Sequence, residues 1–395
     1  MRLIRIPIEQ LQQLFNPGGA SRKKTVSGKG VTLSAGFRSE NGLDGNRMRL
    51  RFSTSPLLAA LLLGLGTSGA PAGAGGSEPL AQARPAAKPA TYTNPVIPDD
   101  FPDPFILRVG STYYAYGTNS GGVDLPVLKS SDLVRWQRVG EGMGRLGAWA
   151  TGGYTWAPEV ARTSAGYVLY YTARHTESGR QCIGVAVSKL PTGPFNDTNK
   201  APLICQLDLG GSIDASPFQD RNGQRYLYWK NDGNCCNQFT GIWVQKLSAD
   251  GLKLVGKATD LLYNGALWEG NLIEAPQVYA RAGKYYLFYS AADYNSDTYA
   301  VGYAVASSPT GPFRKLSREE PWLATKGKVA GPGGQGIITD GKGNPWLYYH
   351  AWTAGQVGYE SGGQRSMRID ALTWKNGLAV LKGPSLTPQV APARP

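Results

Sequence analysis

The chain has 395 residues, and Gly, Pro and Tyr are abundant at 52, 27 and 21 residues. Long apolar helical patterns are absent after residue 90, so we expect an all-β protein rather than a helical or α/β one. The net charge of +13 would suggest nucleic-acid binding, but 8 of these charges fall in residues 1–89. No cluster of basic and aromatic residues accompanies them, and we expect no nucleic-acid partner.

The N-terminal segment has the pattern of an exported protein. Residues 1–47 are polar and basic, and we interpret them as an upstream extension or a mis-assigned start, with a genuine cytoplasmic extension as the alternative. Residues 48–74 contain two arginines, about ten apolar residues and then small residues, which is typical of a signal peptide and too short for a membrane anchor. Residues 75–91 are rich in Ala, Pro and Gly and indicate a linker. We therefore expect a secreted or periplasmic protein without a membrane span after processing.

Export would permit disulfides, and four cysteines allow three pairings. A bond between the adjacent Cys235 and Cys236 would strain the backbone. We therefore expect Cys182 to pair with Cys205, or one of these two to pair with one of the neighbours. No Cys-x-x-Cys motif occurs and the chain has only two histidines, which argues against a zinc site.

A short aromatic pattern recurs five times after residue 94. The repeats start 55, 58, 60 and 60 residues apart, at Tyr113, Val168, Tyr226, Tyr286 and Trp346. Two further segments, 185–195 and 303–313, are near copies that end in Pro-Thr-Gly-Pro-Phe. This period with strand-like aromatic residues predicts a five-bladed β-propeller over residues 92–390, with the active site at one end of the central axis.

A carboxylate close to a proline precedes four of the five aromatic strands. They are Asp103 in F-P-D-P, Glu159 in W-A-P-E, Asp214 in I-D-A-S-P and Glu274 in I-E-A-P. The innermost strands of a propeller line its axis, so these acids would meet in one cup. Acids with almost no histidine favour glycosidic bond cleavage, in which one carboxylic acid protonates the leaving oxygen and one carboxylate activates water. A Ser-His-Asp enzyme is disfavoured because no Gly-x-Ser-x-Gly elbow is present.

Aromatic rings stack on sugar faces, and several lie near the acids or in neighbouring loops. We expect a substrate-binding role for Trp149, Trp156 and Trp268, together with Glu159 and His350. Three alternatives stay open. The tryptophans could pack the blades, Glu159 could be a framework carboxylate, and His350 could belong to the core.

These motifs, together with G-P-G-G and Y-H-A-W, resemble glycoside hydrolase family 43 over about residues 92–390. The resemblance implies an inverting enzyme that acts on arabinose- and xylose-containing polysaccharides of the plant cell wall. It makes Asp103 the general base, Glu274 the general acid, and Asp214 the second acid, which orients Glu274 and would raise its pKa by like-charge repulsion.

Neighbouring acids lack the motif context of these three. Asp99 and Asp100 precede the apolar run and are expected to shape the entry turn, and Glu269 lies outside I-E-A-P. The resemblance also shows a departure, because many family members carry a histidine where this chain has Gly334, and that histidine helps to hold a metal in the central channel. Only His350 could substitute as a ligand, so we expect no cofactor and no calcium.

On this resemblance we expect a secreted monomer that removes L-arabinofuranose from arabinan or arabinoxylan. A β-xylosidase or an endo-1,5-α-L-arabinanase is the alternative, because the catalytic trio does not differ among these enzymes. A propeller that binds carbohydrate without cleaving it is a further alternative, against which the presence of all three acids argues.

Overall fold

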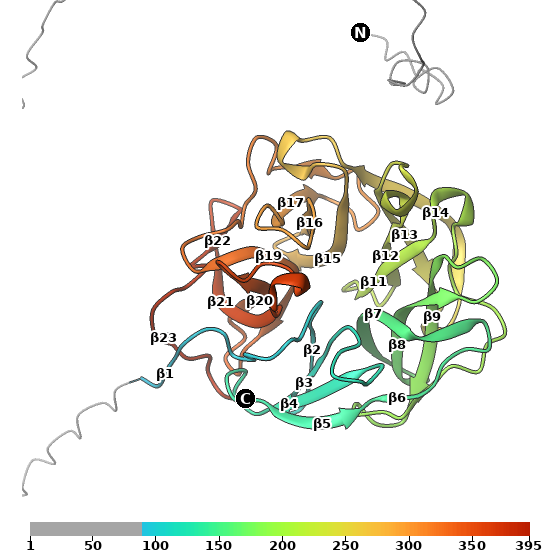
Figure 1. Cartoon of the computed structure of the whole chain (residues 1–395), viewed down its shortest axis with the longest axis horizontal. Helices are drawn as coiled ribbons and strands as arrows, with labels where there is room; N and C mark the ends of the chain where they lie inside the picture. The colour runs from blue at the N-terminus through green and yellow to red at the C-terminus, as the bar shows by residue number, and fades with distance from the viewer. Residues whose placement is uncertain (1–88) are drawn as a thin grey trace, which may run out of the picture. The chain divides into compact units, whose positions relative to one another are not determined.

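The computed structural model describes residues 89–395, and the predicted extension, signal peptide and most of the linker lie outside them. Within these residues the chain forms five small sheets arranged around a central axis (Figure 1). The all-β class and the five-bladed β-propeller are therefore confirmed. In every blade the first strand lies nearest the axis, and the aromatic strand pairs with it in antiparallel fashion.

Blades 1 and 2 differ in their number of strands. Blade 1 contains β2 (Phe105–Val109), β3 (Thr112–Tyr116), β4 (Pro126–Ser130) and β5 (Gln137–Glu141). Blade 2 has a fifth, outermost strand, because β6 from the connection between the blades pairs in parallel with β10. Its strands are β7 (Ala150–Thr163), β8 (Gly166–His175), β9 (Gln181–Ser188), β10 (Phe195–Asn196) and β6 (Met143–Arg145).

Blades 3 to 5 each contain four strands in chain order. Blade 3 consists of β11 (Ser212–Gln219), β12 (Arg225–Asn231), β13 (Gly241–Leu247) and β14 (Leu254–Tyr263). Blade 4 consists of β15 (Ile273–Arg281), β16 (Lys284–Ala291), β17 (Ala300–Ala306) and β18 (Arg314–Lys315). Blade 5 consists of β19 (Val329–Thr339), β20 (Pro345–Thr353), β21 (Ser366–Lys375) and β22 (Leu378–Leu381).

Four 3-10 helices lie in the loops between these strands. They are η1 (Leu207–Leu209), η2 (Gly233–Cys236), η3 (Leu267–Glu269) and η4 (Tyr359–Ser361). No helix among residues 89–395 has the length and apolar character needed to cross a membrane.

The hydrophobic core consists of five wedges, one between each pair of neighbouring blades. Side chains of a strand alternate between its two faces, so each aromatic strand serves two wedges. In β12, Tyr226 and Tyr228 pack toward blade 4, whereas Leu227 and Trp229 pack toward blade 2. Blades diverge with distance from the axis, and large aromatic side chains fill the widening gap. This explains why the sequence repeats tyrosine and tryptophan at this strand.

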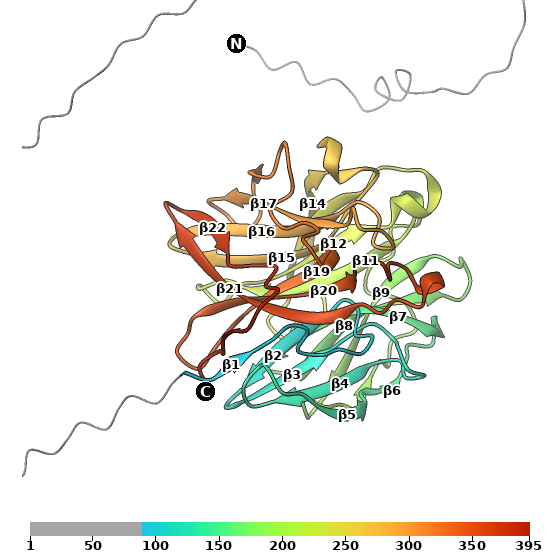
Figure 2. The same ribbon diagram turned by 60° about the vertical axis from the view of Figure 1, so that its left-hand side comes forward.

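The first and last parts of the described chain close the ring. Strand β1 (Thr91–Tyr92) pairs with β23 (Gln389–Val390), and both views place β1 near the C-terminus (Figure 2). Asn94 joins this junction to blade 5. Its amide nitrogen donates to the Ile369 carbonyl at 2.8 Å and to the Ser385 hydroxyl at 2.9 Å, and its oxygen accepts the Ile369 N–H at 3.0 Å.

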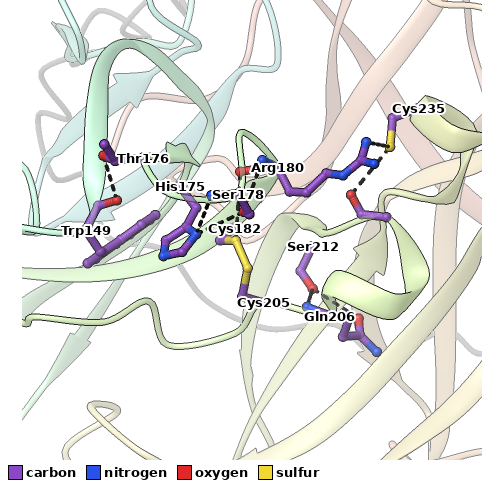
Figure 3. Close-up of a disulfide and its surroundings, with 11 residues drawn as sticks. Trp149, His175, Thr176, Ser178, Arg180, Cys182, Cys205, Gln206, Ser212 and Cys235 are labelled. Atoms are coloured by element: carbon purple, nitrogen blue, oxygen red, sulfur yellow. Dashed lines mark hydrogen bonds between the residues drawn. A yellow bond between two sulfur atoms is a disulfide. The ribbon is translucent and has the colours of Figure 1, made fainter.

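The cysteines form two disulfides. Cys182 of β9 pairs with Cys205 in the connection to blade 3, as expected (Figure 3). Cys235 and Cys236 also pair, which corrects the expectation that neighbours would not. Cys182 and Cys205 are bonded to each other, with a Cα separation of 4.7 Å, so Cys235 and Cys236 in η2 can pair only with each other. Arg180 of blade 2 reaches their sulfur atoms, at 3.3 Å and 2.7 Å.

We predict that Asn94→Ala will lower the melting temperature, because the substitution leaves the Ile369 N–H without its acceptor and the Ile369 carbonyl with the Tyr92 hydroxyl as its remaining side-chain donor. Loss of these bonds should destabilise the fold by about 2 kcal/mol. Thermal denaturation followed by circular dichroism measures the effect. Asn222→Ala, in the exposed turn between β11 and β12, is the control, and equal melting temperatures for the two variants would contradict the proposed closure.

Candidate active site

Each of the five blades carries the same backbone irregularity at the axis. In blades 2 to 5 the pairing of the first strand with the second shifts register there. One residue in each blade adopts a left-handed conformation, which is uncommon for residues other than glycine and clusters at functional sites. These residues, with their φ angles, are Asp103 (48°), Ala157 (41°), Asp214 (57°), Ala275 (48°) and Gly334 (57°).

In four blades the N–H of this bulge residue donates to a side chain of the preceding blade. The acceptor follows the aromatic segment of each repeat, directly in Thr172, Ser290 and His350 and after one further residue in Thr118. The four bonds are Asp103 N to His350 Nδ1 at 3.0 Å, Ala157 N to Thr118 Oγ1 at 2.9 Å, Asp214 N to Thr172 Oγ1 at 3.3 Å, and Gly334 N to Ser290 Oγ at 2.9 Å.

Blade 4 departs from this pattern. The equivalent position in the preceding strand is Lys230, whose ammonium group cannot accept a hydrogen bond. The N–H of Ala275 donates instead to Asp214 Oδ2 at 2.9 Å. The bulges of blades 3 and 4 are therefore joined directly through the Asp214 carboxylate.

The bulges determine where the four predicted acids lie. Asp103 and Asp214 are themselves bulge residues, Glu159 lies two positions beyond its bulge, and Glu274 lies one position before. A cavity at the axis receives residues from all five blades, and Glu274 lies beside it next to Ala275. Its lining residues are Asp103, Pro104, Ala157, Pro158, Glu159, Asp214, Ala275, Pro276, Gly334 and Gln335.

Asp103 is surrounded by groups that favour its ionised form. Its Oδ2 accepts the Thr118 hydroxyl at 2.6 Å, and its Oδ1 lies 3.4 Å from the Arg365 guanidinium. Burial opposes ionisation, but the positive charge of Arg365 and the hydrogen bond from Thr118 outweigh it and hold the pKa of Asp103 below its usual value. Asp103 is therefore an anion at neutral pH, as a general base must be.

Asp214 retains a proton at neutral pH. Burial and the negative charges of Glu274 and Asp103 raise the pKa of Asp214 to about 8, although Lys230 opposes the shift. The site thus combines an ionised carboxylate, Asp103, with a protonated carboxyl group, Asp214, and general base and general acid catalysis requires one group of each kind.

Glu274 is held by donors at both of its oxygens. Tyr299 donates its hydroxyl to Oε1 at 2.7 Å, and Lys230 Nζ lies 3.0 Å from Oε2. Glu269 has a separate structural position, because it is fully buried and binds Tyr289 and Lys315 at the base of η3. The structure therefore separates the two candidate glutamates in the way that their sequence context suggested.

Glu159 lines the cavity, where its carboxylate accepts the Ser216 hydroxyl at 2.9 Å. Burial, reinforced by the charge of Asp214, raises the pKa of Glu159 well above its usual value. Because its carboxyl group is neutral, Glu159 adds no negative charge beside Asp214. Trp156, one residue before the bulge of β7, is half-buried and stays a candidate for substrate contact.

Trp149 and Trp268 do not lie as expected. Trp149 is 4% exposed, stacks on Tyr171 and donates to Asp197, so it belongs to the core. Trp268 stacks on Tyr289 and donates to the Ser317 carbonyl. The same packing unit thus occurs in blades 2 and 4, and these rings pack the blades rather than line the cavity.

His350 is fully buried and has a structural part in the site. Its Nδ1 accepts the Asp103 N–H, which places the ring proton on Nε2. Burial and the neighbouring Arg365 lower the pKa of His350 to about 3, so the ring is neutral. A protonated Nε2 cannot ligate a metal, and residues 89–395 contain no group of three His, Cys, Asp or Glu side chains placed to hold one. These residues do not fit a metal at His350.

Sequence reasoning missed Arg365, Tyr299 and the role of Lys230. Arg365 lies in the loop before β21 and faces the rings of Tyr294 and Tyr359. It is outside the repeated pattern, so periodicity could not find it. Lys230 could have been found by aligning the five strand ends, where it is the only cation.

Comparison with known proteins identifies relatives over the whole propeller. The sequence profile of Glycosyl hydrolases family 43 matches residues 92–379. A β-D-galactofuranosidase of Aspergillus niger is 30% identical over 247 residues, and an extracellular endo-α-(1→5)-L-arabinanase of Thermotoga petrophila is 31% identical over 245. These alignments cover 57% and 53% of this chain, and 66% and 50% of those proteins. The crystal structure of a thermostable family-43 glycoside hydrolase aligns with a TM-score of 0.69 at 33% identity, covering 77% of this chain and all of that one.

We predict that calcium does not stabilise this protein, because the one imidazole at the axis presents a proton rather than a lone pair. Binding to the folded state would raise the melting temperature in a concentration-dependent way. Scanning calorimetry after dialysis against a chelator, and then with added calcium, should give equal melting temperatures. Magnesium is the control for ionic strength, and a rise that saturates with calcium alone would contradict the prediction.

Proposed function

The chain belongs to glycosyl hydrolases family 43, and we propose that it cleaves terminal α-L-arabinofuranosyl residues from arabinan or arabinoxylan with inversion of configuration. One observation carries the proposal. An ionised carboxylate, Asp103, lines the same axial cavity as the protonated Asp214, and Glu274 lies beside this cavity next to Ala275. A single displacement requires this division of charge, because one carboxylate must accept a proton while another group still has one to give.

In the proposed reaction Asp103 removes a proton from water, and the water oxygen forms a bond to the anomeric carbon. The bond from that carbon to the leaving oxygen breaks, and Glu274 gives its proton to this oxygen. Asp103 ends protonated and Glu274 ends ionised, and exchange of one proton with solvent restores both. Thr118 and Arg365 hold Asp103 in place, while Tyr299 and Lys230 hold Glu274.

The choice of a furanose rests on the named relatives. The fungal relative is a galactofuranosidase and the Thermotoga relative an arabinanase, and both names refer to sugars with five-membered rings. An endo-arabinanase is the second candidate, because the latter name specifies internal α-(1→5) bonds. We also propose that the protein acts outside the cytoplasm, as a monomer and without a cofactor, on plant cell-wall polysaccharide.

We predict that Asp103→Asn lowers kcat by about 10²-fold to 10⁴-fold on every substrate, because water activation is lost in all cases. Glu274→Gln should reduce polysaccharide turnover to a similar degree but affect nitrophenyl glycosides much less, since nitrophenolate leaves without protonation. Steady-state kinetics on both substrate types give the comparison. Glu269→Gln is the matched control, which should lower stability without changing kcat, and near wild-type turnover of polysaccharide by Asp103→Asn would refute the assignment.

We predict that kcat/KM for nitrophenyl α-L-arabinofuranoside exceeds that for nitrophenyl β-D-xyloside by at least about tenfold, or roughly 1.4 kcal/mol. Nitrophenyl β-D-galactofuranoside tests the fungal relative's activity in the same assay. NMR of the first sugar released from arabinan should show the β-anomer of arabinose. Faster release of xylose would favour a β-xylosidase, long arabino-oligosaccharides would favour endo action, and an α-anomer would contradict inversion.

A further inference from the structure

One junction in the ring of hydrogen bonds at the axis lacks the usual acceptor, because Lys230 occupies the acceptor position and Asp214 accepts the bulge N–H instead. In the other four blades the equivalent residue accepts the bulge N–H of the next blade. Those acceptors are Thr118, Thr172, Ser290 and His350. The position thus belongs to the structural framework, and a lysine there removes a framework bond.

The Lys230 side chain is directed at the predicted general acid. It is 0% exposed, and its Nζ lies 3.0 Å from Glu274 Oε2, 2.6 Å from Asn234 Oδ1 and 3.6 Å from Asp232 Oδ1. Burial opposes its charge, but the negative charges of Glu274 and Asp232 outweigh burial and raise the pKa of Lys230. A buried cation costs several kcal/mol unless it is paired.

Other charged and titratable groups also face Glu274. Tyr299 donates to its other oxygen and lies flat against His350, with ring centroids 5.9 Å apart. Asp214 approaches through the Ala275 N–H, and Asp232 lies behind Lys230. The groups whose charges interact with that of Glu274 are Asp214, Asp232, Tyr294 and Tyr299. Lys230 is the only cation in direct contact with Glu274.

We propose that Lys230 is a positioning residue for the proposed reaction, which holds the Glu274 carboxyl group beside Asp214 and stabilises the carboxylate that remains after proton donation. Asp232 opposes this effect, because its Oδ1 lies 3.6 Å from the same ammonium group and partly neutralises its charge. The inference rests on the proposed function for the identity of the reaction. It assigns two residues outside the predicted catalytic trio to the control of the acid.

The test is the pH profile of kcat/KM in two variants that should move it in opposite directions. We expect the wild-type profile to fall at high pH, where the site can no longer supply the proton that Glu274 donates. Lys230→Met removes a positive charge, so the site holds this proton more tightly and the basic limb should move up by about one pH unit or more. Asp232→Asn removes a negative charge while Lys230 keeps its contacts with Glu274 and Asn234, so the basic limb should move down.

The acidic limb of the profile reflects protonation of Asp103 and should stay at the same pH in both variants. Lys230→Met should also reduce turnover of polysaccharide by about tenfold more than turnover of nitrophenyl glycosides, because a proton held more tightly is donated more slowly. The matched control is Lys315→Met, which breaks the other buried lysine–glutamate pair, with Glu269 at 2.6 Å. This variant should lose stability and leave both limbs unchanged.

The proposal would be overturned if the basic limb of the profile had the same position in the wild type, Lys230→Met and Asp232→Asn, even if the variants are less stable. Shifts of the same sign in both variants would also overturn it. If the wild type hydrolyses none of the glycosides, the proposed function fails, and the inference is then tested by carbon-13 NMR titration of the Glu274 carboxyl group. Titration midpoints that move in opposite directions in the two variants support it, and unmoved midpoints refute it.

Discussion

A ring of buried N–H groups at the propeller axis sets the geometry on which the site depends. A bulge frees one backbone donor from the sheet in every blade, and a buried donor without an acceptor costs about 1 to 3 kcal/mol. All five donors are satisfied by a side chain from the preceding blade, four of them by the residue that follows the aromatic segment and the fifth by Asp214. Each bulge is therefore held by the neighbouring blade, and the acids on the bulges are positioned relative to one another rather than by their own blade alone.

The same ring separates the charges of the site. Asp103 follows the junction at which His350 is the acceptor, and Arg365 approaches it from blade 5. Asp214 lies two junctions further on, where its oxygen accepts a backbone donor and no arginine is in contact. Two aspartates in equivalent backbone positions consequently have pKa values on opposite sides of the usual value. Neighbouring side chains, rather than the bulge itself, make one a base and keep a proton near the other.

The sequence allowed prediction of those features that recur or that belong to a local motif. The aromatic period revealed the blades because every blade must fill the same wedge, and the proline contexts singled out Asp103, Asp214 and Glu274. Trp149 and Trp268 could not be placed from their distance to the acids alone. Their positions become clear only when blades 2 and 4 are superposed, because both rings stack on a tyrosine of the aromatic strand and pack against a glycine, Gly184 or Gly302.

The glycine at position 334 and the buried histidine at position 350 depend on each other structurally. A Cβ atom at residue 334 would lie 2.6 Å from His350 Nδ1 and 3.2 Å from Asp103 Oδ1, and the left-handed φ of 57° also favours glycine. The space that a side chain at 334 would need is therefore filled by an imidazole whose nitrogen accepts the Asp103 N–H. In this arrangement the histidine near the axis fixes the backbone of the predicted base directly. The absence of a histidine at 334 follows from that packing, because one side chain can occupy the position beneath Asp103 and His350 already does.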